Sequence, residues 1–397
     1  MKNTYLLVVL FVAFVLVVGC VQQQTNVSDN ISDKLSTKTE QKAEQNSVAE
    51  LVLDNQSTNY SKNDSINVMS DKAPEKNETK KTVELQKGVA DPYIEVDTYV
   101  PDKAWIGYTL FPDNHDPANP RVLEVNMLGE VVWEYNLPVE FSGYTNPGFD
   151  VELLSNNNIQ IVVPRKGIFE VDKSGNIVWQ YRTEKVSHDA DRLPNGNILF
   201  AFGNEDKITD AQVKEVTPEG EVVWAWYAKD EYDKSPYKEI SKQGWTHTNA
   251  VLRMDNGDTL ISPRNFNMLI EVDKAGKIVK TIGNGLMKYQ HDPVFLSNGN
   301  LLFANHDKPN EVIEIDPNTT EVIWKFTISK PSMAPVRDVN RLPNGNTLIT
   351  GSSALIEVTP DGEIVWRLKL KNVELTQSTA SQKGFYKAER IEKIIGD

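Results

Sequence analysis

The sequence predicts an all-β protein: a six-bladed β-propeller of four-stranded antiparallel blades, closed by a C-terminal strand. Three observations predict this fold. One hairpin phrase occurs six times, a second hairpin phrase lies between its copies, and the pair repeats about every 45 residues. Because four short strands in a period of that length are typical of a propeller blade, we expect each period to form one blade.

The first phrase is an alternating strand, a polar turn that usually carries glycine, and a second alternating strand, which together predict a hairpin. One copy is FEVDKSGNIVWQY. The six copies begin at Leu123, Phe169, Lys214, Ile270, Ile313 and Ile356. Five carry a tryptophan, at Trp133, Trp179, Trp224, Trp324 and Trp366, and Lys280 replaces it in the fourth copy. We expect these hairpins to form the outer half of each blade.

The second phrase is a hairpin around Asn-Gly or Asn-Asn, as in DADRLPNGNILFAF. Its five copies begin at Asp150, Asp189, Asn249, Asp292 and Asp338. The first outer hairpin is preceded only by a lone strand from Lys103, so one inner strand is missing there. We expect GFYKAERIEKII, which begins at Gly384 and echoes DADRL, to supply that strand and close the ring. A solenoid is the alternative, but it would need capping repeats that are not evident.

Residues 1–20 resemble an export signal with a lipid attachment site. Lys2 precedes an apolar run from Tyr5 to Val18, which is short for a spanning helix and typical of a signal h-region. The small residues before Cys20 resemble the lipobox of secreted lipoproteins, in which that cysteine is acylated. An uncleaved signal anchor is the alternative. Both predict that the rest of the chain is extracytoplasmic and anchored to the outer face of the cell membrane.

Residues 21–87 are polar and show no sustained hydrophobic period, so they cannot bury enough apolar surface to offset the entropy of ordering. They hold six N-x-S/T sequons, at Asn26, Asn30, Asn55, Asn59, Asn63 and Asn77. These sequons indicate a glycosylated stalk, or they arise by chance in a segment rich in Asn and Ser. We therefore expect a disordered tether here, followed by the propeller domain at residues 88–397.

The charge and cysteine content limit the function classes. A formal net charge of −14 at pH 7 argues against nucleic acid as a partner, because the phosphate backbone would be repelled. An anionic substrate would need a local basic pocket inside this acidic protein. Cys20 is the only cysteine, which excludes an intramolecular disulfide.

A propeller brings equivalent residues of different blades together, because the innermost strand of each blade lines the central channel. The residues that open the six inner strands are Phe149, His188, His247, His291, Arg337, and Tyr386 or Lys387. The next strand runs back toward the same face, where the corresponding residues of three blades are Arg165, Arg264 and His306. We expect these side chains to meet at one mouth of the channel. They would form the cationic, proton-exchanging pocket that an anionic substrate needs.

Two other roles are open to the three histidines of this register. Each could hydrogen-bond a neighbouring blade, or together they could hold zinc or copper. Nearby guanidinium groups would repel a cation, so we predict no metal. Asp189 and Asp292, which follow two of the histidines, are expected to point to the opposite face as structural acids between blades. His115 lies off the register and is expected at the surface.

In these motifs the sequence resembles the aryl-sulfate sulfotransferase (arylsulfotransferase) family, from roughly Tyr93 to the C-terminus. The resemblance rests on the order of short pieces along the chain: GYTLF from Gly107, the LPNGN-type hairpins, WTHTNAV from Trp245, SPRNFN from Ser262, QHDP from Gln290 and FYKAERI from Phe385. It implies a six-bladed propeller that moves a sulfuryl group from an aryl sulfate donor to a phenolic acceptor. It also implies a ping-pong route through a sulfated histidine with no nucleotide donor, and we predict no cofactor.

The resemblance further implies roles for individual residues. The catalytic residues would be His188, His247, Arg264 and the nucleophile His291. Two further residues are expected to bind substrate from their positions in the repeat: Asn249, two residues beyond His247 on the same strand face, and Arg337, which opens an inner strand. These residue types suit the chemistry, because sulfuryl transfer, like phosphoryl transfer, depends on positioning and on cationic stabilisation of charge spread over three oxygens.

Two other functions fit parts of the pattern. A non-catalytic cell-surface propeller would use the same basic pocket to bind anionic ligands or a partner protein. A quinoprotein dehydrogenase is a weaker alternative, suggested by the repeated Gly-x-x-x-Trp phrases. That class normally has eight blades and a calcium-binding set of carboxylates, and neither is evident in this sequence.

Overall fold

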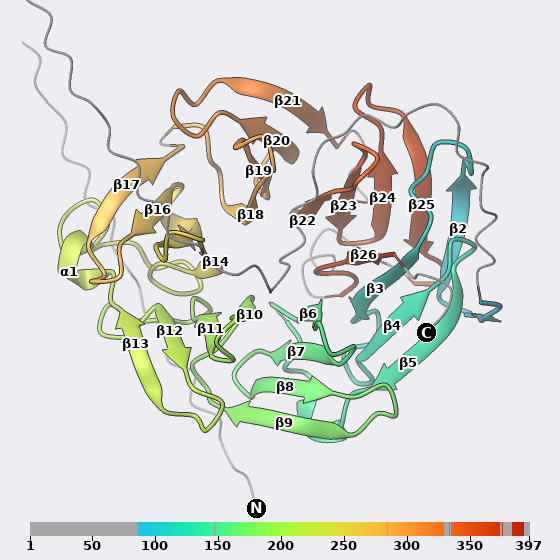
Figure 1. Cartoon of the computed structure of the whole chain (residues 1–397), viewed down its shortest axis with the longest axis horizontal. Coiled ribbons are helices and arrows are strands. Elements are labelled where there is room, and N and C mark those ends of the chain that lie inside the picture. The colour runs from blue at the N-terminus through green and yellow to red at the C-terminus, as the bar shows by residue number, and fades with distance from the viewer. Residues whose placement is uncertain are drawn as a thin grey trace, which may run out of the picture. The chain divides into compact units, whose positions relative to one another are not determined.

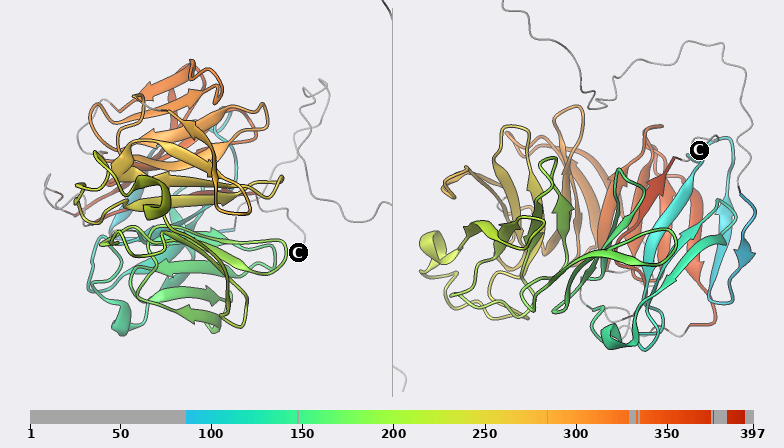
Figure 2. Two further views of the ribbon diagram at one scale, coloured as in Figure 1. Left: turned by 90° about the vertical axis from the view of Figure 1, so that its left-hand side faces the viewer. Right: turned by 60° about the horizontal axis from the view of Figure 1, so that its bottom comes forward.

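The computed structural model describes residues 86–392 apart from 147, 284, 329–332, 334, 374 and 376–382. In this part of the chain six antiparallel sheets stand around one central axis (Figure 1), with the strands of neighbouring sheets side by side in the tilted view (Figure 2). The predicted six-bladed, all-β propeller is confirmed. The predicted signal and tether, residues 1–20 and 21–87, lie outside the described residues except for 86 and 87.

Four blades are meanders of four strands, ordered from the inner to the outer strand along the chain. Blade 2 comprises β6 (Asp150–Leu153), β7 (Ile159–Val163), β8 (Gly167–Val171) and β9 (Ile177–Arg182). Blade 3 comprises β10 (Ala190–Arg192), β11 (Ile198–Ala201), β12 (Val213–Val216) and β13 (Val222–Trp226). Blade 4 comprises β14 (Thr248–Arg253), β15 (Thr259–Pro263), β16 (Leu269–Val272) and β17 (Ile278–Ile282). Blade 5 comprises β18 (Gln290–Phe295), β19 (Leu301–Asn305), β20 (Glu311–Ile315) and β21 (Val322–Thr327).

The first and last blades contain the four predicted strands and a fifth strand at the outer edge. Blade 1 has the order β1 (Val89–Ala90), β5 (Glu130–Asn136), β4 (Arg121–Val125), β3 (Tyr108–Asp113) and β26 (Glu389–Ile391). Blade 6 has the order β2 (Ile94–Tyr99), β25 (Ile364–Leu370), β24 (Ala354–Val358), β23 (Thr347–Gly351) and β22 (Val336–Arg341). The extra strands β1 and β2 come from residues that precede the repeats, and each covers the outer edge of a blade.

The ring is closed by the C-terminal strand, as the sequence predicts. β26 pairs with β3, with Glu389 opposite Leu110 and Ile391 opposite Tyr108. Blade 1 is therefore built from two segments that lie far apart in the chain. β26 covers the inner edge of blade 1. It takes the place of the copy of the second phrase that this blade lacks.

The strand burial follows the repeat. Middle strands such as β4 and β7 are buried along their whole length, whereas the outer strand β9 alternates between exposed and half-buried residues. The PNGN turn shows why the hairpins form: the Gly196 N–H donates to the Leu193 carbonyl at 2.8 Å, with Gly196 at a φ of 85°. Glycine adopts this left-handed conformation without strain, so the turn is specified locally.

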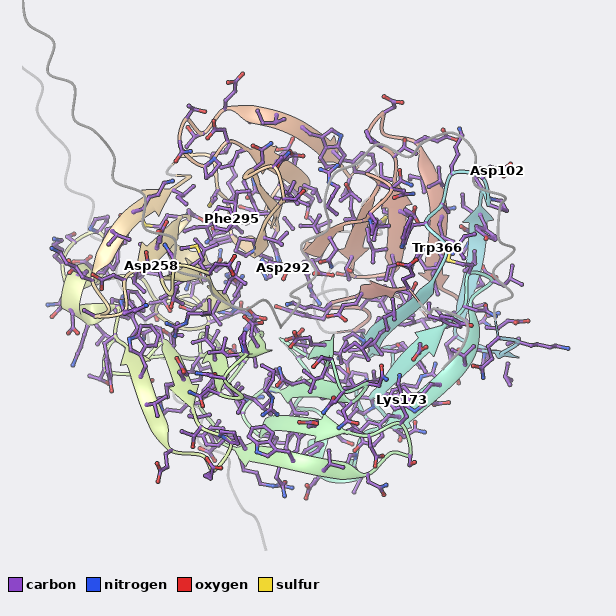
Figure 3. All side chains as sticks on the ribbon, in the orientation of Figure 1. Asp102, Lys173, Asp258, Asp292, Phe295 and Trp366 are labelled. Atoms are coloured by element: carbon purple, nitrogen blue, oxygen red, sulfur yellow. The ribbon has the colours of Figure 1, made fainter. Side chains whose placement is uncertain are left out.

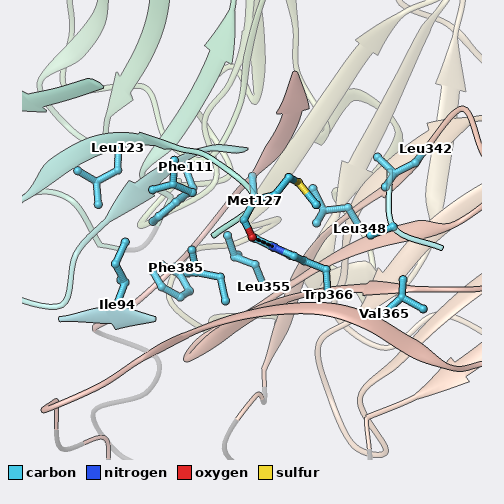
Figure 4. Packing of buried hydrophobic residues seen from close by; sticks show 14 residues of the cluster. Ile94, Phe111, Leu123, Met127, Leu342, Leu348, Leu355, Val365, Trp366 and Phe385 are labelled. Carbon is cyan, nitrogen blue, oxygen red and sulfur yellow. Dashed lines mark hydrogen bonds between the residues drawn. The ribbon is translucent and has the colours of Figure 1, made fainter. Parts of the chain in front are cut away.

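Indole groups join neighbouring blades on the outer side of the ring. In five blades the tryptophan Nε1–H donates to a backbone carbonyl of the next blade. The pairs are Trp133 with Lys173, Trp179 with Pro218, Trp224 with Lys274, Trp324 with Pro360, and Trp366 with Met127. In blade 4 the Lys280 ammonium donates to Asn318 instead, at 2.7 Å. The Trp366 bond ties blade 6 to blade 1 within a buried apolar cluster (Figure 4).

An ion pair accompanies several of these contacts. An arginine near the end of an inner strand pairs with a glutamate of the preceding blade at 2.6–3.1 Å: Arg192 with Glu170, Arg253 with Glu215, Arg341 with Glu314, and Arg390 with Glu357. Arg390 lies in β26, so the closing strand repeats the contact that Arg192 makes in blade 3. This shared contact explains why AER echoes DADR.

The helices in the described residues are short: η1 (Val139–Phe141), α1 (Lys229–Tyr232) and η2 (Arg264–Phe266). None of the helices there has the length and hydropathy needed to cross a membrane.

Candidate active site

Three predicted histidines and a tyrosine meet at the centre of the ring, where the inner strands begin. His188 precedes β10, His247 precedes β14, and His291 lies at the start of β18. His188 Nε2 lies 3.1 Å from His247 Nε2. The Tyr386 ring centroid lies 5.8 Å from that of His188 and 6.4 Å from that of His291. All four side chains are buried, so the convergence predicted from the register is observed.

Two guanidinium groups lie against this cluster. Arg264 begins η2 directly after β15, and its Nη1 lies 3.1 Å from His247 Nε2. Arg337 of β22 lies over the Tyr386 ring, with 4.9 Å between Cζ and the ring centroid. Both arginines are buried. The cluster therefore carries two fixed positive charges inside an acidic protein.

A fourth histidine completes the cluster. His306 follows β19, and its ring stacks on the His291 ring with centroids 4.7 Å apart and an angle of 28° between the planes. The repeat placed His306 at the mouth, but it did not indicate a contact with the predicted nucleophile. We call the following seven side chains the imidazole layer: His188, His247, His291, His306, Arg264, Arg337 and Tyr386.

The turns before the inner strands direct these side chains inward. His188 has a φ of 77° and His247 a φ of 49°, which are costly for residues with a Cβ atom unless other bonds hold them. The Asp206 carboxylate holds one turn by accepting the backbone N–H groups of His247 at 3.1 Å and Trp245 at 2.8 Å. The repeat gave no signal for Asp206, because it lies in a loop outside both phrases.

Hydrogen bonds to backbone carbonyls determine which nitrogen of each histidine ring carries the proton. His291 Nδ1 lies 2.8 Å from the Tyr289 carbonyl, which can only accept, so Nδ1 carries the proton and Nε2 holds the lone pair. His247 Nδ1 likewise donates to the Gln243 carbonyl at 2.8 Å. His247 Nε2 therefore holds a lone pair, which accepts the Arg264 Nη1–H. Because this lone pair also faces His188 Nε2, His188 Nε2 must carry a proton. The lone pair of His188 is therefore on Nδ1.

The environment keeps the imidazoles neutral. Burial, followed by the charges of neighbouring groups, holds the pKa of His188 and His291 well below the usual range. For His247, burial and the Arg264 charge lower the pKa to about 3, although its bond to Gln243 opposes this. Burial also raises the pKa of the Tyr386 phenol above its ordinary value. At neutral pH the cluster therefore offers uncharged ring nitrogens beside charged guanidinium groups.

Several polar atoms of these residues have no hydrogen-bond partner although they are buried. They are His188 Nδ1, His306 Nδ1, the Tyr386 hydroxyl oxygen and Asn249 Oδ1. The Asn249 amide nitrogen donates to the Gln290 carbonyl at 2.8 Å, which places Asn249 beside the strand that carries His291. Buried polar atoms of this kind are normally satisfied, so the group has the character of a ligand site.

One residue further along the same strands lies a second layer of opposite character. The Lys387 ammonium lies 3.5 Å from Asp150, 3.1 Å from Asp189 and 3.0 Å from Asp292. Figure 3 shows Asp292 at the centre of the ring. We call Lys387, Asp150, Asp189, Asp292 and Asp338 the carboxylate layer. The sequence left open whether Tyr386 or Lys387 opens the closing strand. Both side chains reach the centre of the ring, Tyr386 in the imidazole layer and Lys387 in the carboxylate layer.

The prediction for the aspartates is partly correct. Asp189 accepts the Val251 N–H at 2.7 Å and Asp292 accepts the Val339 N–H at 3.4 Å, so each joins one blade to the next. Both carboxylates also contact the Lys387 ammonium, which the sequence did not predict. His188, which precedes Asp189, and Asp292 itself have left-handed φ values of 77° and 46°.

Arg165 and His115 lie away from the cluster. Arg165 borders a separate hollow of about 550 Å³ with Tyr144 and Lys166, and it pairs with Glu205 at 3.7 Å, so its expected place in the pocket is wrong. The expected surface position of His115 is also wrong. Its side chain is only 11% exposed, because its ring stacks on Tyr93 with centroids 4.3 Å apart.

In the described part of the chain, no group of three or more His, Cys, Asp or Glu side chains is placed to hold a metal ion. The histidines face one another in pairs and lie beside guanidinium groups. This geometry suits an anion better than a cation.

Comparison with known proteins gives one family match. The model of a family described as Arylsulfotransferase (ASST) matches residues 68–285. The curated proteins include no match. Among solved structures, a Bacteroides caccae protein of unknown function shares 17% identity, with a TM-score of 0.52 over 72% of this chain and 98% of its own. A virginiamycin B lyase from Staphylococcus aureus shares 13% identity, with a TM-score of 0.43 over 72% of this chain and 89% of its own.

Proposed function

This chain belongs to the arylsulfotransferase (ASST) family, and on that premise we propose that it is an exported, membrane-anchored enzyme that transfers a sulfuryl group from an aryl sulfate to a phenol through a sulfated His291. The observation that carries this proposal is the pairing of a neutral imidazole with fixed cations. His291 has its lone pair on Nε2, and the charges of Arg264 and Arg337 lie in the same buried cluster.

In the first half-reaction, the Nε2 lone pair of His291 forms a bond to sulfur. The bond between sulfur and the aryl oxygen breaks, and its electron pair leaves with the phenolate, which is protonated in solvent. The guanidinium groups of Arg264 and Arg337 bind the three sulfuryl oxygens as charge develops on them. His247 supports Arg264 in this task by accepting its Nη1–H at 3.1 Å.

In the second half-reaction, a phenol oxygen attacks the sulfur and Nε2 of His291 leaves. The phenol proton passes to the free lone pair on His188 Nδ1 and then to solvent. Binding of the sulfuryl anion assists this transfer, because its negative charge offsets the guanidinium charges that lower the pKa of His188. Asn249, whose Oδ1 has no protein partner, can accept a hydrogen bond from the substrate.

Rapid mixing with 4-nitrophenyl sulfate, followed by intact-mass and peptide mass spectrometry, tests the function. We expect an acid-labile addition of one sulfuryl group to the peptide that contains His291, and its loss when a phenol is added. His291→Ala should lose both the addition and the turnover. A wild-type protein that binds aryl sulfates without forming the adduct would instead be the non-catalytic surface propeller.

The anchor rests on the sequence at Cys20 and has its own test. Mass spectrometry of the mature protein from membranes should find a lipid-modified N-terminal cysteine, and Cys20→Ser should abolish the modification. Recovery of an intact Met1 would support the signal-anchor alternative. Either result leaves the chemistry at His291 unaffected, because the anchor and the active site are tested separately.

A further inference from the structure

The contact between His306 and His291 has no role in the two half-reactions above. The His306 ring lies on the His291 ring at 4.7 Å with 28° between the planes, so its face, rather than its edge, meets the nucleophile. The backbone holds this contact. The Tyr289 carbonyl accepts the His291 Nδ1–H at 2.8 Å and also the backbone N–H of His306 at 3.4 Å.

Sulfuryl transfer changes the charge of the His291 ring. When Nε2 forms the bond to sulfur and Nδ1 keeps its proton, the ring becomes an imidazolium that carries a negatively charged sulfonate. The positive charge appears in a buried site where Arg264 and Arg337 already lie, so it is repelled by both. Groups that favour this cation are therefore needed at the ring itself.

We propose that His306 is a positioning residue whose neutral ring face stabilises the imidazolium charge of sulfated His291. This inference rests on the proposed function. A cation lying over an aromatic face is attracted by the electrons of the ring, and the attraction is stronger where water is excluded. Because His291 is uncharged before the reaction, the attraction grows as the charge forms and therefore lowers the barrier.

The neighbours of His306 favour this role. Burial and the charges of Arg337 and Arg264 keep the pKa of His306 well below its usual range, so its face is uncharged at neutral pH. A lysine or a protonated histidine at this position would repel the imidazolium. A saturated side chain would fill the space without attracting it. The stacking geometry thus makes aromatic character, rather than proton transfer, the property that matters.

Two substitutions separate these roles. His306→Phe keeps an aromatic face and cannot carry a proton, whereas His306→Leu removes the face. We expect the single-turnover rate of His291 sulfation to stay within about threefold of wild type for the Phe variant and to fall about tenfold for the Leu variant. His306→Met provides a second non-aromatic side chain if the Leu variant fails to fold.

The chain offers a matched control. His115 stacks on Tyr93 at 4.3 Å and 29°, a geometry similar to that of the His306 pair but outside the imidazole layer. His115→Leu should leave the sulfation rate unchanged. A Phe variant as slow as the Leu variant would overturn the proposal in favour of proton transfer by His306. A Leu variant as fast as wild type would overturn it in favour of simple packing.

A second measurement does not need activity. With carbon-13 label in the five histidines, NMR during acidification follows the protonation of His291, which places the same charge on its ring. We expect His291 to protonate about tenfold more readily in the Phe variant than in the Leu variant. Equal protonation in the two variants would overturn the proposal. If the wild type forms no sulfohistidine, the proposed function fails, and this comparison still decides the role of His306.

Discussion

The imidazole layer and the carboxylate layer are built from adjacent residues of the same strands, yet they differ in almost every physical respect. Four residues of the imidazole layer directly precede a residue of the carboxylate layer, in the pairs His188–Asp189, His291–Asp292, Arg337–Asp338 and Tyr386–Lys387. The first member of each pair belongs to an aromatic or positively charged set, and the second to a set in which one ammonium is surrounded by carboxylates. Residues that are adjacent in the sequence therefore belong to two different sites. One is the candidate active site, and the other is the ion-pair cluster around Lys387.

The two layers also respond oppositely to burial. Burial lowers the pKa of the four histidines of the imidazole layer, so they stay neutral by losing protons. Burial raises the pKa of Asp150 to about 7, against the Lys387 charge, so this aspartate tends to stay neutral by keeping its proton. The comparison predicts that substitutions in the imidazole layer change activity, whereas those in the carboxylate layer change stability.

The largest expected effect on stability is in the carboxylate layer. Lys387→Met would leave Asp150, Asp189 and Asp292 near one another without their shared cation. We expect the free energy of unfolding to fall by about 3 kcal/mol. This value is at the lower end of the range for breaking a buried ion pair, because the Lys387 side chain is 18% exposed. Denaturant unfolding measures this loss. A loss below about 1 kcal/mol would mean that the layer does not hold the ring closed.

Arg264 and Arg165 test the other half of the comparison, because each follows a proline at the end of the second strand of its blade. Arg264→Lys keeps the charge but loses the planar fork, so we expect kcat to fall about 10- to 1000-fold with little change in stability. Arg165→Lys, in the separate hollow, should leave kcat within about twofold. Steady-state assays with 4-nitrophenyl sulfate and a phenol measure both. If the two substitutions lower kcat equally, Arg165 belongs to the active site after all.

The smallest expected effect is the dependence of stability on pH between 6.5 and 8. Native Asp150 and Glu389 keep their protons to about pH 7 and Glu152 to about pH 8, because burial raises the pKa of each. Unfolded carboxyl groups lose theirs near pH 4, so the native state binds more protons and stability falls as pH rises toward 8. The histidines oppose this only below about pH 6.5. Thermal unfolding at several pH values should show this decrease in stability. Glu152→Gln should make the decrease smaller, by at most about 1.4 kcal/mol per pH unit.

The sequence predicted the fold and the convergence of three histidines because both follow from the repeat register. It did not predict how the side chains pack after the strands end. Arg165 and Arg264 occupy equivalent positions, but Arg165 has a φ of 62° and lies over Tyr144, whereas Arg264 opens a short helix toward His247. Such differences depend on loop contacts that no repeat encodes.

Other parts could not be predicted for different reasons. β1 and β2 pair with blades through backbone bonds, and neither contains the repeated phrases. Asp206 acts through carboxylate bonds to backbone N–H groups, which leave no pattern in a single sequence. The tryptophans were visible as a repeat, but their bonds to the next blade could be recognised only once the blades were placed in order.

The closing strand also determines the order in which the molecule can assemble. Lys387 reaches Asp189 across 198 positions of the chain, and Trp366 reaches Met127 across 239, whereas the hairpins within a blade join residues that are close in sequence. Contacts between distant residues require long loops to close, so they form late in folding. An intermediate with its blades formed and its ring still open would lack Tyr386 beside the histidines and Lys387 among the aspartates. Refolding would therefore recover strand structure before it recovers the site.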